Sequence, residues 1–145
     1  MLVFLDIDGV MVPAKSWTNP ELLNDGFPAF SSEAIAALQA IISNDTIIVL
    51  TTSHKANYSL EQWKQIFENR GIFVEKIQSL EANTDNLNRR DEILRWFVGK
   101  NLNDGFVIID DDKSLNDLPE HLKSKLVLTH AMVGLTREQV AEIKK

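Results

Sequence analysis

Short apolar segments separated by polar turns recur along the chain and predict buried β-strands. The clearest of these segments are residues 2–5, 47–50, 106–109 and 126–128. Short segments of consecutive apolar residues are typical of strands that are covered on both faces of a sheet. A weaker segment, residues 72–74 after the turn residue Gly71, predicts a further strand.

The segments between these strands carry apolar residues three or four positions apart, which is the spacing of an amphipathic helix. One helix is predicted from Ser32, and another begins after a capping box formed by Ser59 and Gln62. A third helix is predicted over residues 91–97, and a last one begins near Thr136.

Strands that alternate with helices predict right-handed crossovers and a mostly parallel sheet with helices on both faces. We therefore expect an α/β fold, a single Rossmann-like domain over residues 1–145 with a five-stranded sheet. In such sheets, ligands bind at the carboxyl ends of the strands. Candidate functional residues are therefore those that directly follow the predicted strands.

Charge and composition limit which partners and which cellular location the sequence favours. The chain has 15 basic and 21 acidic side chains, and its net charge of -6 argues against general adhesion to nucleic acids or anionic membranes. It has no cysteine, which excludes disulfides and thiolate ligands and fits a cytoplasmic location. We expect neither a membrane span nor a secretory signal, because apolar runs are short and Asp6 and Asp8 interrupt the first.

Polar side chains follow three of the predicted strands at the point where each ends. Asp6 and Asp8 follow the first strand, and because they are two positions apart in an extended segment, they can face one site. Gly9 then permits a sharp turn. The residues after the other two strands are the hydroxyls Thr51, Thr52 and Ser53 and the carboxylates Asp110, Asp111 and Asp112.

Several carboxylates at one edge of a sheet cannot all stay charged unless a cation lies among them. Oxygen ligands without cysteine suit a hard ion such as Mg²⁺, which proteins hold with carboxylates, water and substrate phosphate. One carboxylate can attack phosphorus, and a second can protonate the leaving oxygen and then activate water. The pattern therefore favours Mg²⁺-dependent phosphoryl transfer.

Three segments resemble motifs of the haloacid dehalogenase-like (HAD) superfamily. They are Asp6-Ile7-Asp8-Gly9-Val10, Thr51 after an apolar strand, and the strand end Ile108-Ile109-Asp110-Asp111, which correspond in order to the first, second and fourth motifs. The resemblance spans nearly the whole chain. It implies a phosphatase that works through an aspartyl-phosphate intermediate.

The resemblance also implies a role for each matching residue. Asp6 is expected to be the nucleophile and Asp8 the general acid/base, while Thr51 binds the transferring phosphoryl group. We also expect Thr52, the next hydroxyl after the strand, to bind phosphate. The implied Mg²⁺ ligands are Asp6, Asp110, Asp111 and the backbone carbonyl of Asp8.

The third motif departs from the family pattern. The family usually places a Lys near the start of the helix before the fourth motif, and here the matching stretch is Asn88-Arg89-Arg90-Asp91-Glu92-Ile93. We assign the phosphate-binding role to Arg89, with Arg90 as the alternative. An Arg keeps the charge but binds phosphate as a fork rather than as a point. Lys55 and Lys76 are further candidates that reach in from elsewhere.

The spacing of the motifs resembles that of capless HAD proteins, because the intervals between them leave no room for a large cap domain. An open site suits a large phosphorylated substrate, such as a nucleic-acid end or a protein. Residues 90–97 and the segment Gly134-Leu135-Thr136 resemble those of small capless members, including HAD domains attached to RNA repair enzymes.

Two other functions fit the same acidic edge. A metal-dependent nuclease also gathers carboxylates there but needs no nucleophilic carboxylate. A non-catalytic HAD-fold domain would only bind a metal or a phosphorylated partner. Fold and function are separate claims, so both alternatives stay open.

Several conspicuous residues have structural explanations. Asp112 is expected to cap the short segment near Leu115 rather than to bind metal. The aromatic residues expected in the core are Trp63, Phe67, Trp96 and Phe97. Trp17, in the long loop after the first motif, is expected either to line the site or to cover the edge of the core.

Overall fold

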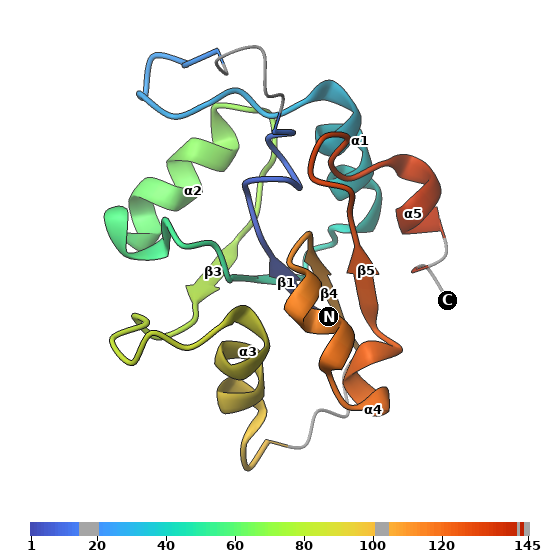
Figure 1. Ribbon diagram of the computed structural model, residues 1–145. Helices are drawn as coiled ribbons and strands as arrows, with labels where there is room; N and C mark the ends of the chain where they lie inside the picture. Colours follow the sequence, from blue (N-terminus) through green and yellow to red (C-terminus); the bar gives the residue numbers. More distant parts are fainter. Residues whose placement is uncertain (15–20, 101–104, 142, 144–145) are drawn as a thin grey trace.

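A five-stranded parallel sheet forms the centre of the fold (Figure 1). The computed structural model describes residues 1–14, 21–100, 105–141 and 143. The strands are β1 (Leu2–Leu5), β2 (Ile47–Leu50), β3 (Lys76–Ser79), β4 (Phe106–Asp110) and β5 (Leu126–Leu128). They are arranged in the order β3-β2-β1-β4-β5, and every neighbouring pair is parallel. The predicted small Rossmann-like α/β fold is confirmed.

Helices cover both faces of the sheet. They are α1 (Ser32–Ile41), α2 (Leu60–Glu68), α3 (Arg89–Phe97), α4 (Glu120–Lys123) and α5 (Arg137–Ala141), with two short 3₁₀ helices, η1 (Lys55–Asn57) and η2 (Lys113–Asp117). Figure 1 shows α1, α2 and α5 in the upper half of the view, with α3 and α4 in the lower half. No large cap domain interrupts the described parts of the chain.

The sheet separates two apolar cores because successive side chains of a strand point to opposite faces. Val3 and Leu5 of β1 pack in the first core with residues of α1, α2 and α5. Phe4 packs in the second core with residues of α3, η2 and α4. The predicted core positions of Trp63 and Phe67 are confirmed, since both side chains are fully buried.

Side-chain caps define where several helices begin. The predicted capping box of Ser59 and Gln62 is present at the start of α2. Helix α3 begins at Arg89, earlier than the predicted Asp91, because the Asn88 side chain accepts a hydrogen bond from the Asp91 amide at 2.8 Å. This earlier start places Arg89 in the first turn of the helix.

The predicted strand at residues 72–74 is wrong, and β3 lies further along the chain. Ile72 and Val74 are buried against the first core, but the pairing with β2 begins at Lys76, opposite Ile47. Because β3 is an edge strand, exposed and half-buried residues alternate along it. The consecutive apolar residues 72–74 therefore mark a segment that packs in the core, and the strand itself lacks this pattern.

The strand order creates a switch point beside β1. The chain passes from β3 at one edge of the sheet to β4 on the other side of β1. Leu5 is in register with Leu50 on β2 and with Ile109 on β4. The residues after these three positions therefore meet at one carboxyl edge, which is where open α/β sheets bind ligands.

Candidate active site

Asp6, Thr51 and Asp110 lie side by side because their strands are in register. The Asp6 amide donates a hydrogen bond to the carbonyl of Ile109 at 3.1 Å, and the Thr51 amide donates to the carbonyl of Leu5 at 3.0 Å. All three side chains are buried. The sheet itself therefore fixes the centre of the candidate site.

Three carboxylates gather at this edge. Asp6, Asp110 and Asp111 each offer an oxygen, and these oxygens lie within 4.8 Å of one another. Gly9 leaves room for the third carboxylate, because a Cβ on Gly9 would lie 2.0 Å from Asp111 Oδ2. The φ of +82° at Gly9 also favours glycine in this turn.

The carboxylates are in an environment that resists negative charge. Burial and, to a smaller extent, the charge of Asp110 together raise the pKa of Asp6 to about 9, against the opposing effect of Arg89. Burial also raises the pKa of Asp110. A bound divalent cation would stabilise the ionised forms. The oxygen donors of Asp6, Asp110 and Asp111 therefore fit a hard ion such as Mg²⁺.

Arg89 reaches the same site from the first turn of α3. Its Nη1 donates hydrogen bonds to Asp110 Oδ2 at 2.5 Å and to Thr51 Oγ1 at 3.3 Å. The same nitrogen lies 3.5 Å from Asp6 Oδ1. Although burial opposes the charged form of Arg89, the charges of Asp110 and Asp6 raise its pKa. Arg89 thus places a permanent positive charge beside the carboxylates.

The other candidates for the third-motif role lie elsewhere. Arg90 pairs with its neighbour Asp91 at 3.1 Å. Lys76 begins β3 opposite Ile47, so it lies at the amino edge of the sheet, away from the carboxylates. Lys55 is buried in an ion pair of its own. Of the proposed cations, Arg89 is therefore the one in contact with Asp6 and Asp110.

The two threonines after β2 differ in their contacts. The Thr51 hydroxyl donates a hydrogen bond to Asp110 Oδ2 at 3.2 Å, directly in the carboxylate cluster. The buried Thr52 hydroxyl accepts a hydrogen bond from the His54 amide at 3.2 Å. Thr52 therefore shapes the loop after β2, and its predicted contact with phosphate stays a prediction.

The Asp8 side chain lies outside the carboxylate cluster. Its side chain is 57% exposed, and a hydrogen bond of 2.8 Å joins its Oδ2 to His54 Nε2. The cluster of possible metal ligands in the described residues contains Asp6, Asp110 and Asp111 but not the Asp8 side chain. The contribution predicted for Asp8 to a metal site rests on its backbone carbonyl.

Two residues that support this edge, Glu92 and Thr129, were not predicted from the sequence. Glu92 on α3 is buried and contacts both Arg89 and Lys55. Thr129, after β5, donates from its hydroxyl to the carbonyl of Gly9 at 2.8 Å, and its amide donates to the carbonyl of Asp110 at 2.8 Å. The available signal for Glu92 was its spacing of three residues from Arg89 on one helix.

Asp112 has the expected structural role. Its Oδ1 accepts a hydrogen bond from the Ser114 amide at 2.9 Å and so caps η2. The Asp112 amide in turn donates to Asp110 Oδ1 at 3.1 Å, which helps to orient that carboxylate. Trp17, which was considered as a lining residue, lies outside the described residues.

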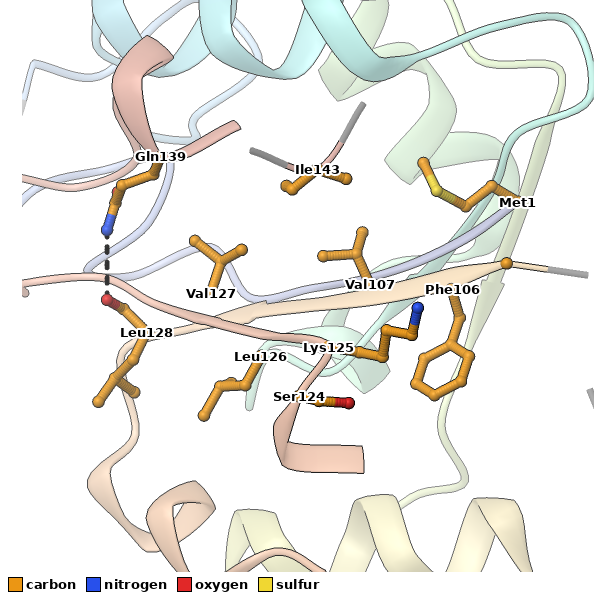
Figure 2. Close-up of a pocket in the computed structure, with 11 residues that line it drawn as sticks. Met1, Phe106, Val107, Ser124, Lys125, Leu126, Val127, Leu128, Gln139 and Ile143 are labelled. Atoms are coloured by element: carbon orange, nitrogen blue, oxygen red, sulfur yellow. Dashed lines mark hydrogen bonds between the residues drawn. The ribbon is translucent and has the colours of Figure 1, made fainter. Parts of the chain in front are cut away.

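A cavity of about 490 Å³ lies away from the carboxylates. Its lining includes Met1, Phe106 and Leu126, which are at the amino ends of β1, β4 and β5. Figure 2 shows Val107 and Val127 pointing from the sheet into this region. The cavity contains none of the candidate catalytic residues, so we do not place the chemistry there.

Comparison with known proteins identifies the family. Residues 2–140 match the family described as the HAD domain in Swiss Army Knife RNA repair proteins. The chain therefore belongs to this HAD family, and the resemblance inferred from its motifs is confirmed. Searches of curated proteins and of solved structures give no match. Within the described residues, no helix is long and apolar enough to cross a membrane.

Proposed function

We propose that this protein is a Mg²⁺-dependent phosphatase that hydrolyses phosphomonoesters through an aspartyl-phosphate at Asp6. The observation that carries the proposal is the buried contact of Asp6 with Asp110, Asp111 and Arg89. A nucleophile, a set of oxygen ligands and a fixed cation in one place are the parts that phosphoryl transfer requires.

The first step forms a bond between Asp6 and phosphorus. An Asp6 oxygen attacks the phosphoryl group, the bond from phosphorus to the leaving oxygen breaks, and Asp8 gives its proton to that oxygen. Arg89 and Thr51 stabilise the charge on the transferring group. The exposed position of Asp8 at the rim suits contact with a leaving group that extends into solvent.

The second step restores the enzyme. Asp8, now ionised, takes a proton from water, and the resulting hydroxide attacks phosphorus and releases inorganic phosphate from Asp6. Mg²⁺ held by Asp6, Asp110, Asp111 and the backbone carbonyl of Asp8 would offset the negative charge of the carboxylates and the phosphate. This arrangement would let Asp6 act in its ionised form despite its burial.

We propose a phosphorylated nucleic-acid end as the substrate class. The family to which the chain belongs is described as the HAD domain of RNA repair proteins, and this description favours an RNA end over a phosphoprotein. The absence of a large cap in the described residues suits a substrate that extends away from its terminal phosphate. Arg89 supplies a fork-shaped donor for that phosphate.

The direct test compares activity toward an aryl phosphate, phosphopeptides, and RNA or DNA oligonucleotides that carry a 3′- or 5′-phosphate. We expect Mg²⁺-dependent release of inorganic phosphate, with an RNA or DNA end preferred over the phosphopeptide. Asp6→Asn should lose this activity almost completely. Cleavage of internal phosphodiesters that persists in Asp6→Asn would indicate a nuclease, and full phosphatase activity in that variant would exclude the covalent mechanism.

A further inference from the structure

A buried ion pair lies next to Arg89 but outside the carboxylate cluster. Lys55 Nζ lies 2.9 Å from Glu92 Oε2, and the two side chains are 6% and 5% exposed. Lys55 comes from η1, after β2, whereas Glu92 comes from α3. The pair therefore connects the segment after β2, which begins with Thr51, to the helix that carries Arg89.

Glu92 contacts the guanidinium of Arg89 on the side away from the carboxylates. Glu92 Oε1 lies 3.6 Å from Arg89 Nε, whereas Arg89 Nη1 contacts Asp110 and Thr51. The two ends of the planar guanidinium are thus held by different groups. An Arg fixed at both ends loses less conformational freedom when it binds a phosphoryl group.

Lys55 is itself held in place by the backbone. Its amide donates a hydrogen bond to the carbonyl of Thr52 at 3.1 Å. Its carbonyl accepts one from the indole Nε1 of the fully buried Trp63 at 3.2 Å. These backbone hydrogen bonds therefore fix the segment from which the Lys55 ammonium group reaches Glu92.

We infer that Lys55 and Glu92 form a positioning pair that sets how far Arg89 extends into the site, an inference that rests on the proposed function. The Glu92 carboxylate contacts two cations. Its Oε2 pairs with Lys55 and its Oε1 contacts Arg89. Because Lys55 neutralises part of the Glu92 charge, Arg89 can contact Glu92 and still reach Asp110 and Thr51. A buried carboxylate that lost Lys55 would take Arg89 as its sole charged partner.

The test uses the whole chain and three variants, which are Lys55→Met, Glu92→Gln and the double variant. Inorganic phosphate is the probe, and its dissociation constant is measured by calorimetry with Mg²⁺ present, because binding requires no turnover. Aryl phosphate kinetics give KM and kcat separately. The Arg89 Nε–H signal in ¹⁵N NMR spectra, assigned with Arg89→Lys, reports the order of the side chain without any ligand.

We expect Lys55→Met to weaken phosphate binding roughly tenfold and to raise KM in parallel, because Glu92 withdraws Arg89. In the double variant, part of the phosphate affinity should return, because the uncharged Gln at position 92 no longer attracts Arg89 away from the site. The Arg89 Nε–H signal should shift in Lys55→Met and should broaden in Glu92→Gln, where the anchor is lost. Glu33→Gln is the control, since it weakens the separate ion pair with Arg137 and should leave the phosphate affinity and the Arg89 signal unchanged.

Lower melting temperatures with unchanged phosphate affinity and an unchanged Arg89 signal in all three variants would show that the pair is only structural, and would overturn the inference. A wild-type protein that binds phosphate but hydrolyses no phosphomonoester would contradict the proposed function alone. The Arg89 signal and the phosphate affinities would still decide the role of the pair in that case.

Discussion

At the scale of single residues, the proposed chemistry depends on a carboxylate that the fold buries, Asp6. Asp6 is held at the end of β1 with Asp110 and Asp111 beside it, so charge on it is costly until a cation is present. Metal binding would therefore favour the ionised form of the buried Asp6 carboxylate. The same environment makes the free protein sensitive to pH.

The first prediction concerns that pH dependence. The pKa of Asp6 rises from 3.8 to about 9 on folding, chiefly through burial. The folded state therefore keeps a proton that the unfolded state has lost, so the stabilisation present below pH 3.8 declines as pH rises toward 9. We expect the melting temperature of metal-free protein to fall across this range, and less so in Asp6→Asn. Equal pH profiles for the two proteins would contradict the assignment.

The second prediction concerns Asp8. If it gives a proton to the leaving oxygen, Asp8→Asn should lose roughly 10²- to 10⁴-fold in kcat for an alkyl phosphate. An aryl phosphate with an acidic phenol as its leaving group needs less protonation, so the loss should be much smaller. Steady-state kinetics with a series of leaving groups measures the difference. An equal loss for every leaving group would argue that Asp8 has another role.

The site residues next to the strand ends could be predicted from the sequence, but the buried ion pair that contacts Arg89 could not. Asp6, Thr51 and Asp110 stand directly after apolar segments, and the parallel register brings such positions together. Glu92 and Lys55 are far apart in the sequence, and both are residue types that usually lie on the protein surface. Their burial depends on the packing of α3 against the loop after β2, which no local pattern encodes.

At the scale of elements, α2 holds the loop that precedes α1. Arg70, just after α2, lies 2.6 Å from Asp25 Oδ2 and donates hydrogen bonds to the carbonyls of Phe27 and Pro28. The hydrogen bonds from Arg70 lower the pKa of Asp25 below its usual range. The ring of Phe27 in turn packs edge-on against His54, the partner of Asp8. The loop is thereby connected to the rim of the site.

The third prediction follows from this connection. Arg70→Met should lower the free energy of unfolding by about 3 kcal/mol, because it leaves buried carbonyls and Asp25 without their donor. Chemical denaturation measures this loss. Arg137→Met is the matched control, since it removes an exposed pair with Glu33 and should change stability little. Equal stabilities of the two variants would contradict the structural role of Arg70.

Element boundaries show where sequence patterns succeed. β1, β2 and β5 lie where consecutive apolar residues predicted them, and β4 extends one residue further, to Asp110. β3 was misplaced because an edge strand lacks that pattern, and α4 was missed because a helix of 4 residues is too short to show a periodicity. Long periodic segments and buried strands were predictable, whereas edge and single-turn elements were not.

At the scale of the whole molecule, the strand order places the site at the carboxyl edge beside β1, and the surface charge limits how a substrate is held. The chain carries a net charge of -6, so it cannot attract a polyanion over its whole surface. Binding of the proposed nucleic-acid end would therefore depend on local contacts with Arg89 and with the proposed metal ion. In this proposal the substrate is held mainly by its terminal phosphate.

The fourth prediction tests this mode of binding. The logarithm of KM for a phosphorylated oligonucleotide should change with the logarithm of salt concentration with a slope of about 1 in magnitude, as expected for one or two phosphate contacts. kcat/KM should be nearly the same for short and long oligonucleotides. A steep salt dependence and a strong preference for long chains would instead show an extended nucleic-acid interface.

The central claim is that Asp6 becomes phosphorylated during turnover. The most direct measurement is an acid quench of the enzyme during reaction with substrate and Mg²⁺, followed by borohydride reduction and peptide mass spectrometry. Reduction converts an aspartyl-phosphate to homoserine, and we predict homoserine at position 6 in the wild-type protein and none in Asp6→Asn. Phosphate release without modification of Asp6, or modification at Asp8 or Asp110 instead, would contradict the account.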